Sequence, residues 1–245
     1  MSDSTSQKKD MSFLDHLEEL RGRIFHSLIA IIIVGIVCAI YVDELVNNIL
    51  FYHLNQLDLK VQVLTPYGIV LLYMEVVITS AIIFSMPIIL WQVWKFISPA
   101  LLQKERKYIF WITFFTSFCF FAGVAFGFFI LIPTSMNFFA HFRTEMISLN
   151  ISADKYISFV LTFIFASGIL FEMPMVAYFL SRMGILTPAF MRHYRRHSIV
   201  GILIISAIVT PTPDLMTQSL LAMPMFLLYE LSIFISKFAQ KKEIV

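Results

Sequence analysis

Charged residues are scarce in this chain. Aspartate, glutamate, lysine and arginine make up 14% of the 245 residues, against about a quarter in ordinary soluble domains. The hydrophobic fraction is 59%, and the mean hydropathy is +0.82. This composition excludes a water-soluble globular domain and indicates an all-α protein that crosses a membrane several times. The basic residues stand in short stretches beside apolar runs, so we expect no nucleic-acid partner.

Cysteine is also rare. Cys38 and Cys119 both fall inside apolar runs, where a free thiol behaves as a small hydrophobic group. We therefore expect neither a disulfide nor a metal site, and no motif predicts a cofactor. The N-terminus lacks the pattern of a cleavable signal peptide, because its apolar run is long and no A-x-A site follows it. Residues 1–11 are predicted to form a disordered cytoplasmic tail.

Six apolar runs are candidate membrane spans, since a spanning helix needs about 20 apolar residues. One of them, 198–209, has only 12 residues. Together they predict one membrane domain over residues 12–238, followed by a cytoplasmic tail over 239–245. The predicted spans are 24–41, 69–94, 108–132, 157–180, 198–209 and 215–236.

Lysine and arginine are distributed very unevenly between the two sides of these spans. With a cytoplasmic N-terminus, all of the 18 basic residues face the cytoplasm except Lys60, Arg143 and Lys155. Basic residues in short loops are retained on the cytoplasmic side. Both termini are therefore predicted to be cytoplasmic.

Prolines and connection lengths predict the shape of the bundle. Pro87, Pro174 and Pro224 fall inside spans, where each removes a helix hydrogen bond and permits a kink. The connections 43–68 and 133–156 have room for short surface helices, whereas 211–214 predicts a tight turn. We expect a kinked, curved bundle whose fifth and sixth helices are short, and a short span thins the bilayer or lies behind its neighbours.

Gly123 and Gly127 form a G-x-x-x-G pair in the third span. This pattern allows two helices to approach closely. We expect it to pack against another helix of the same chain, with a self-association surface as the alternative.

Glu172 lies well inside the fourth span, just before Pro174. A carboxyl group at that depth costs a few kcal/mol and usually faces a protein or water-filled interior. It is a candidate for a proton relay, an ion site or a polar anchor. The alternative is a protonated glutamate bonded to a carbonyl that the proline leaves free. Glu75 and Glu230 lie nearer to span ends, where water or a cytoplasmic basic residue can reach them.

Two polar residues stand at the start of the sixth span. Asp214 follows Pro213 and can cap the helix. Gln218 lies one turn deeper and can form a hydrogen bond to a neighbouring helix.

Two further carboxylates lie on the predicted cytoplasmic side. Glu19 belongs to the amphipathic segment 13–23 before the first span, and it precedes Arg23 by four residues, which favours an ion pair. Glu105 lies among basic residues in the loop after the second span. Each can be a solvated helix charge. Together they can recognise two guanidinium groups, because lysine cannot copy the planar fork that arginine presents to a carboxylate.

Five motifs in order give the chain a resemblance to a known family over about residues 12–238. It resembles the TatC family, the multispanning receptor subunits of the twin-arginine protein translocase. The matching residues are His16-Leu17, Glu19-Leu20-Arg21 and Arg23; Trp91-Gln-Val-Trp94, Phe96, Pro99-Ala-Leu101 and Glu105-Arg106; Phe171-Glu-Met-Pro174; Pro213-Asp214 through Gln218; and Ala222-Met-Pro224.

The resemblance implies roles for these residues. In this family the glutamates that match Glu19 and Glu105 contact the twin arginines of the cargo signal peptide. Arg21, Phe96 and Pro99 belong to the same cytoplasmic patch. The glutamate that matches Glu172 faces the concave side of a glove-like fold of six helices. The hairpin of the fifth and sixth spans docks single-span TatA- and TatB-type partners, with Gln218 and Asp214 as the expected contacts.

It also implies Sec-independent export of folded proteins, without enzymatic activity and driven by the proton-motive force. The expected location is the inner membrane of a bacterium, with an archaeal or organellar membrane as alternatives. There the protein is surrounded by membrane lipid and associates with itself. One residue departs from the family pattern, since Glu75 stands where members often have lysine, and a charge-specific role at this position stays open.

Two other classes of function fit part of the sequence. A secondary transporter would use Glu172 to couple protons to a solute, but the halves show no convincing repeat and the surface carboxylates would have no role. An intramembrane enzyme fits less well, because His16-Leu-Glu-Glu-Leu lacks the second histidine of H-E-x-x-H. The spans contain no evident serine–histidine or aspartate pair.

Overall fold

The structure, a computed structural model, describes residues 13–56, 61–98, 109–141, 151–210 and 215–241. Almost all of these residues are helical, because a backbone in hydrocarbon must satisfy its hydrogen bonds within its own segment. In chain order the elements are α1 (Phe13–Ile40), α2 (Val42–Glu44), η1 (Leu45–Leu50), α3 (Tyr52–Gln56), β1 (Val61–Gln62), α4 (Gly68–Ile97), α6 (Ile109–Phe126), η3 (Gly127–Leu131), α7 (Ile132–His141), β2 (Ile151–Ser152), α8 (Ala153–Leu170), α9 (Met173–Arg182), α10 (Pro188–His193), α11 (Arg195–Val209) and α12 (Leu215–Lys241).

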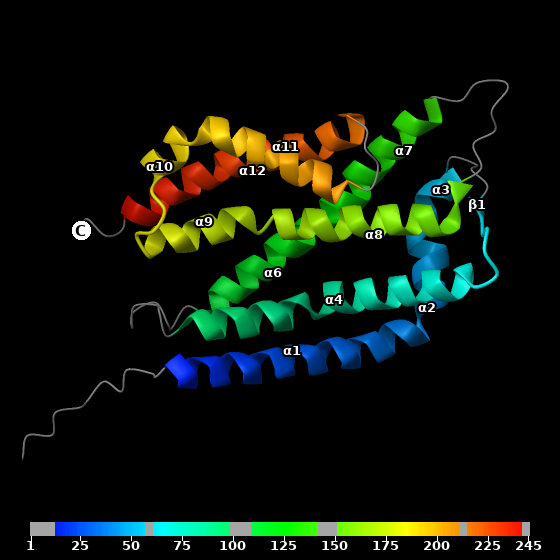
Figure 1. The fold of residues 1–245 in the computed structure, drawn as a ribbon, viewed down its shortest axis with the longest axis horizontal. Helices are drawn as coiled ribbons and strands as arrows, with labels where there is room; N and C mark the ends of the chain where they lie inside the picture. Colours follow the sequence, from blue (N-terminus) through cyan, green and yellow to red (C-terminus); the bar gives the residue numbers. More distant parts are fainter. Residues whose placement is uncertain (1–12, 57–60, 99–108, 142–150, 211–214, 242–245) are drawn as a thin grey trace, which may run out of the picture.

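The helices lie roughly side by side, with one crossing the others (Figure 1). α1 packs along α4, and α9 packs along α12, which also contacts α11. The line formed by α6, η3 and α7 crosses diagonally and packs against α8. The N-terminal end of α1 and the C-terminal ends of α4 and α12 lie toward the same end of the molecule.

Five helical stretches in the described part of the chain are long and apolar enough to cross a membrane. They are His16–Ile40, Gly68–Ile97, Ile109–Ala140, Ala153–Arg182 and Leu215–Gln240. The predicted fifth span corresponds to α11, which has 15 residues and is therefore about 22 Å long. A bilayer's hydrocarbon core is about 30 Å thick, so α11 is a short helix, as predicted. A sixth crossing, the side of the termini and the glove shape stay predictions.

The sixth predicted helix is not short, and this prediction is wrong. α12 has 27 residues and continues past the predicted end of the membrane domain. Its last turns pack against the end of α9. Ser181 Oγ donates to Ser236 Oγ at 2.6 Å, and Arg182 Nη1 donates to the Ala239 carbonyl at 3.4 Å. Because Ala239 is buried, the predicted tail from 239 begins inside this helix.

The prolines act in two different ways. Pro174 is the second residue of α9, and a turn at Phe171 and Glu172 separates α8 from α9. The helix is therefore interrupted where a kink was predicted, although Ala153–Arg182 remains one helical stretch. Pro87 and Pro224 lie inside the continuous helices α4 and α12.

The two connections that were predicted to lie outside, 43–68 and 133–156, contain short helices, as expected, and a strand pair that was not predicted. β1 pairs in parallel with β2, with Val61 opposite Ile151. Close by in the sequence, Tyr156 Oη donates to the Leu50 carbonyl at 2.8 Å. The segment after α1 is therefore bound to the beginning of α8.

The glycine pair in α6 and η3 packs inside the bundle, as predicted. A Cβ atom at Gly123 would overlap the Ser167 carbonyl oxygen and come within 2.8 Å of Phe171 Cβ. On the facing helix, a Cβ at Gly168 would come within 2.7 Å of the Phe120 ring. Phe120 and Phe163 are fully buried in this contact region.

Candidate functional site

The N-terminal end of α1 and the C-terminal end of α4 form one surface, made of His16, Glu19, Arg23, Gln92 and Phe96. We refer to it as the α1–α4 surface. Arg23 Nε donates to Glu19 Oε1 at 3.1 Å, and Arg23 Nη2 donates to the same oxygen. This confirms the predicted ion pair. Arg23 Nη1 also reaches Gln92 Oε1 at 3.5 Å, so the pair is tied to α4.

The second oxygen of Glu19 has a different environment. The side chain is 20% exposed, and Oε2 is buried without a hydrogen-bond partner among the described residues. A buried acceptor that lacks a donor costs about 1–3 kcal/mol, and more when it is charged. The carboxylate is therefore held by Arg23 through one oxygen, and its second oxygen is a buried acceptor that the described residues leave unsatisfied.

Aromatic contacts join the other residues at this end. The His16 ring stacks on Phe96, with centroids 4.4 Å apart and planes 16° apart. This contact fixes the last turn of α4 against the first turns of α1. Arg21 is exposed, and its guanidinium lies over the Phe25 ring at 5.7 Å. The structure thus brings Glu19 and Phe96 to one surface, while Arg21 contacts the next turn of α1.

Three predicted site residues lie outside the described residues. They are Pro99 and Glu105, in the connection between α4 and α6, and Asp214, before α12. Their roles stay predictions.

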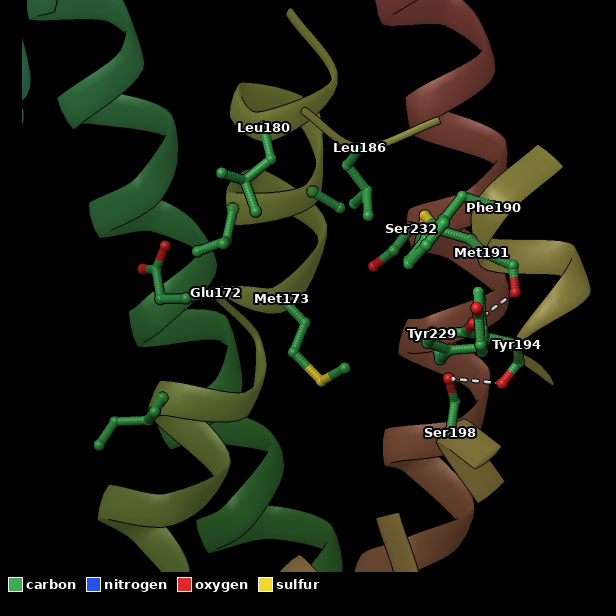
Figure 2. A pocket seen from close by; sticks show the side chains of 13 residues that line it. Glu172, Met173, Leu180, Leu186, Phe190, Met191, Tyr194, Ser198, Tyr229 and Ser232 are labelled. Atoms are coloured by element: carbon green, nitrogen blue, oxygen red, sulfur yellow. Dashed lines mark hydrogen bonds between the residues drawn. The ribbon is translucent and has the colours of Figure 1, made fainter. Parts of the chain in front are cut away.

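Glu172 lies at the break between α8 and α9. Its Oε1 atom is buried and has no hydrogen-bond partner in the part of the chain that the structure describes. Figure 2 shows the carboxylate pointing away from Met173 and Tyr229, toward the green helix α6. This geometry gives no support to the simple alternative in which Oε1 is bonded to a carbonyl that Pro174 leaves free.

The other polar residues noted in the spans all have partners. Ser158 Oγ donates to Glu75 Oε1 at 2.5 Å, which joins α8 to α4. Arg195 Nη2 donates to Glu230 Oε2 at 2.6 Å, which confirms that a basic residue reaches Glu230. Gln218 Nε2 donates to the Leu203 carbonyl at 3.0 Å, so the predicted hydrogen bond across helices is confirmed within the α11–α12 pair.

His53 is a buried polar residue that sequence reasoning did not single out. It is 5% exposed and lies against Phe128, with ring centroids 4.7 Å apart. Burial lowers the pKa of His53 below its usual value, and a hydrogen bond to the Phe128 backbone opposes this with a smaller effect that raises the pKa. Nε2 is buried without a partner among the described residues. The signal in the sequence is a histidine that follows four apolar or aromatic residues, 49–52.

No group of three or more histidine, cysteine, aspartate or glutamate side chains that could hold a metal ion is found across residues 13–241, apart from the gaps given above. Every site described so far consists of hydrogen bonds, ion pairs and ring contacts. Such an arrangement can bind a cationic or apolar partner through existing side chains.

Comparison with known proteins identifies the family. The model of the family described as "Sec-independent protein translocase protein (TatC)" matches residues 15–224. TatC of Carboxydothermus hydrogenoformans is 37% identical over 237 residues, which cover 97% of each chain. TatC of Escherichia coli is 34% identical over 235 residues, covering 92% of this chain and 88% of that protein.

A solved structure agrees with the sequence comparison. The crystal structure of the twin-arginine translocase receptor TatC superimposes with a TM-score of 0.83 at 34% identity, covering 91% of this chain and 99% of that one. A second crystal structure of TatC, in detergent, gives a TM-score of 0.82 at the same identity. The chain therefore belongs to the TatC family of non-enzymatic receptor subunits of the Sec-independent protein translocase.

Proposed function

We propose that this protein binds the twin-arginine signal peptide of folded cargo, and that Glu19 supplies one of the two carboxylates that contact the arginines. The observation that carries the proposal is the state of the Glu19 side chain. Arg23 holds one oxygen in place, and the other is buried and accepts no hydrogen bond from the described residues. A guanidinium that donates to Oε2 satisfies this acceptor, and Arg23 can keep its bonds to the other oxygen; because Oε2 is buried, the groups that cover it must move to admit the peptide.

Chain connectivity supports Glu105 as the second carboxylate. Glu105 precedes Ile109, the first residue of α6, by four positions, and four residues span at most about 14 Å. The first turn of α6 lies toward the same end of the molecule as the start of α1 (Figure 1). The stack of Phe96 on His16 fixes the other end of this connection against α1. This connectivity supports the proposal that Glu105 acts at the same end of the bundle as Glu19.

We expect the protein to bind a signal peptide with arginines more tightly than one with lysines in their place. Arginine donates two parallel hydrogen bonds to a carboxylate, whereas lysine behaves as a point charge. A hydrogen bond to a charged group contributes about 1.5–3 kcal/mol. Loss of one such contact therefore weakens binding by about 10- to 150-fold.

The α11–α12 hairpin is the surface that we assign to single-span TatA- and TatB-type partners. Its outward apolar residues include Ile204, Ile208 and Leu215, which are all more than half exposed. Gln218 joins the two helices through the Leu203 carbonyl. Because α11 is shorter than the hydrocarbon core is thick, partner helices beside it meet a thinned part of the bilayer.

Transport in this proposal takes place in the bacterial inner membrane, with both termini in the cytoplasm. The proton-motive force supplies the energy, about 2.3 kcal/mol per elementary charge per 100 mV. Glu172, whose Oε1 is buried without a partner among the described residues, is the intramembrane polar group of the translocase.

The test is binding of a synthetic twin-arginine signal peptide to the purified protein, with a twin-lysine peptide as the comparison. We expect Glu19→Gln and Glu105→Gln each to weaken arginine binding by tenfold or more. Glu18→Gln is the matched control, because Glu18 is an exposed carboxylate on the same helix. Equal binding of the two peptides, or equal binding by the Glu19 and Glu18 variants, would contradict the proposal.

A further inference from the structure

A cavity of about 490 Å³ lies between α9, α10, α11 and α12. Figure 2 shows its wall, with Met173 and Leu180 on the α8–α9 side and Met191, Tyr194 and Tyr229 on the opposite side. Its volume falls within the range of about 300–1,000 Å³ that is typical of ligand sites. The Glu172 carboxylate points away from this space, so the one acidic residue found in the wall among the described residues does not face the opening.

Three hydroxyl groups of the wall, those of Tyr229, Ser232 and Ser198, are already used by the protein. Tyr229 Oη donates to the Met191 carbonyl at 2.7 Å, and Ser232 Oγ donates to the Leu228 carbonyl at 2.7 Å. Ser198 Oγ donates to the Tyr194 carbonyl at 3.2 Å. Because these donors are engaged, an occupant of the cavity meets mainly methyl, methylene and ring surface. A hydrocarbon chain fits this chemistry.

Basic residues follow the lining residues of the cavity at one corner of the fold. Arg192 follows the lining residue Met191, and Arg195 and Arg196 follow the lining residue Tyr194, at the corner between α10 and α11. All three side chains are exposed. Glu230 is the acidic residue that faces this corner, and it is paired with Arg195. Arg192 and Arg196 form no ion pair among the described residues, so this corner carries excess positive charge.

We propose that the cavity binds an anionic phospholipid, with an acyl chain between α9 and α12 and the phosphate at the Arg192–Arg196 corner. Basic pockets between membrane helices attract anionic lipid headgroups, and each basic residue near the surface adds to the attraction. Phe190 and Tyr194, both exposed beside the arginines, suit the polar boundary of a membrane, where aromatic rings gather. Neither the cavity nor these arginines belong to the α1–α4 surface.

The test is retention of lipid by the purified full chain, measured by native mass spectrometry. Phosphatidylglycerol and phosphatidylcholine with the same acyl chains are the probes. We expect phosphatidylglycerol to be retained preferentially, and the double variant Arg192→Gln/Arg196→Gln to lower its retention about tenfold. Lys155→Gln is the charge control, because Lys155 is exposed at the start of α8.

A second variant tests the cavity rather than the charge. Val176 lines the cavity and is 47% exposed, so Val176→Phe fills part of the space without entering the packed core. It should lower retention of both lipids, whereas Val93→Phe, on an equally exposed part of α4, should not. Melting temperatures within about 2 °C of the parent show that the variants are folded.

Three results would overturn the proposal. The first is equal retention of the two lipids by the parent protein. The second is a decrease in phosphatidylglycerol retention by Lys155→Gln as large as that by the double arginine variant. The third is equal lipid retention by Val176→Phe and Val93→Phe. A photo-crosslinking residue at Val176 that captures signal peptide rather than lipid in membranes would assign the cavity to the peptide instead. The signal-peptide proposal does not depend on any of these outcomes, since its test uses Glu19 and Glu105.

Discussion

Replacement of Gly123 by alanine tests the tightest helix contact of the bundle. The added methyl group would overlap the Ser167 carbonyl oxygen and lie within 2.8–2.9 Å of Phe171 Cβ and Gly168 Cα. Two of these atoms belong to the α8 backbone, and the third is the Cβ of Phe171, the residue after α8. None of them can move away by a side-chain rotation. The helices α6 and α8 must therefore separate. Overpacking of this kind costs about 1–3 kcal/mol.

The loss of stability can be measured as a lower melting temperature of the protein in detergent. At about 2–4 °C per kcal/mol for a chain of this size, a cost of about 2 kcal/mol lowers the midpoint by roughly 4–8 °C. The matched control is Gly201→Ala in α11, where no atom lies within 4 Å of the added Cβ. There alanine should raise the midpoint, because it gains about 1 kcal/mol of helix propensity over glycine.

Gly127 offers a second check on the same contact. A Cβ at Gly127 would overlap the Ser167 Oγ atom, while its backbone neighbours on α8 lie beyond 3 Å. Ser167→Ala should therefore rescue much of the damage of Gly127→Ala and little of that of Gly123→Ala. If Gly123→Ala melted at or above the parent temperature, or if Ser167→Ala rescued both glycine variants equally, the reasoning about this packing would be wrong.

Three further predictions concern polar groups. Burial lowers the pKa of His53 below 6.5, so the unfolded state binds more protons than the folded state. Stability should therefore decline as the pH falls below about 6.5. In His53→Gln this part of the pH dependence of the melting temperature should disappear. For Glu172, we expect export of a twin-arginine reporter in cells to survive the change to Gln better than the change to Leu, and equal export by the two variants would argue against a polar role. Gln218→Ala should reduce co-purification of TatA- or TatB-type partners, whereas Gln240→Ala, which removes a bond of 3.4 Å to the Leu186 carbonyl, should not.

Sequence patterns predicted the local features of this fold well, because local forces decide them. Apolar runs located the long helices, since the bilayer requires a minimum length of hydrocarbon-soluble chain. The spacing of Glu19 and Arg23 predicted their ion pair, and Pro174 marked the break before α9. The glycine pair predicted a close contact, although only the structure shows that its partner is α8.

Features that depend on distant residues were not predictable in this way. The His16–Phe96 stack requires the relative register of α1 and α4, which no single helix contains. The extension of α12 to Lys241 depends on partners in α9, such as Ser181 for Ser236. His53 is buried against Phe128, a residue of η3 that is distant in the sequence.

The candidate site was predicted in part. Glu19 and Phe96 lie together at one end of the bundle, as the motifs indicated. His16 and Gln92 belong to the same motifs, but their contacts with Phe96 and Arg23 could be assigned only in three dimensions. The pairing of Glu19 with Glu105 in space stays a prediction that the peptide-binding experiment addresses.

The attachment of the segment after α1 to the beginning of α8 has a consequence for synthesis of the protein. Leu50 and its partner Tyr156 are 106 residues apart in the chain. The paired strands β1 and β2 are also far apart in the sequence. At about 5–20 residues per second, a ribosome needs roughly 5–20 s to make the intervening chain. During that interval α1 and α4 can already pair, while α2, η1 and α3 have left the ribosome without the residues that bury them. During this interval these short helices are therefore exposed to quality-control proteases.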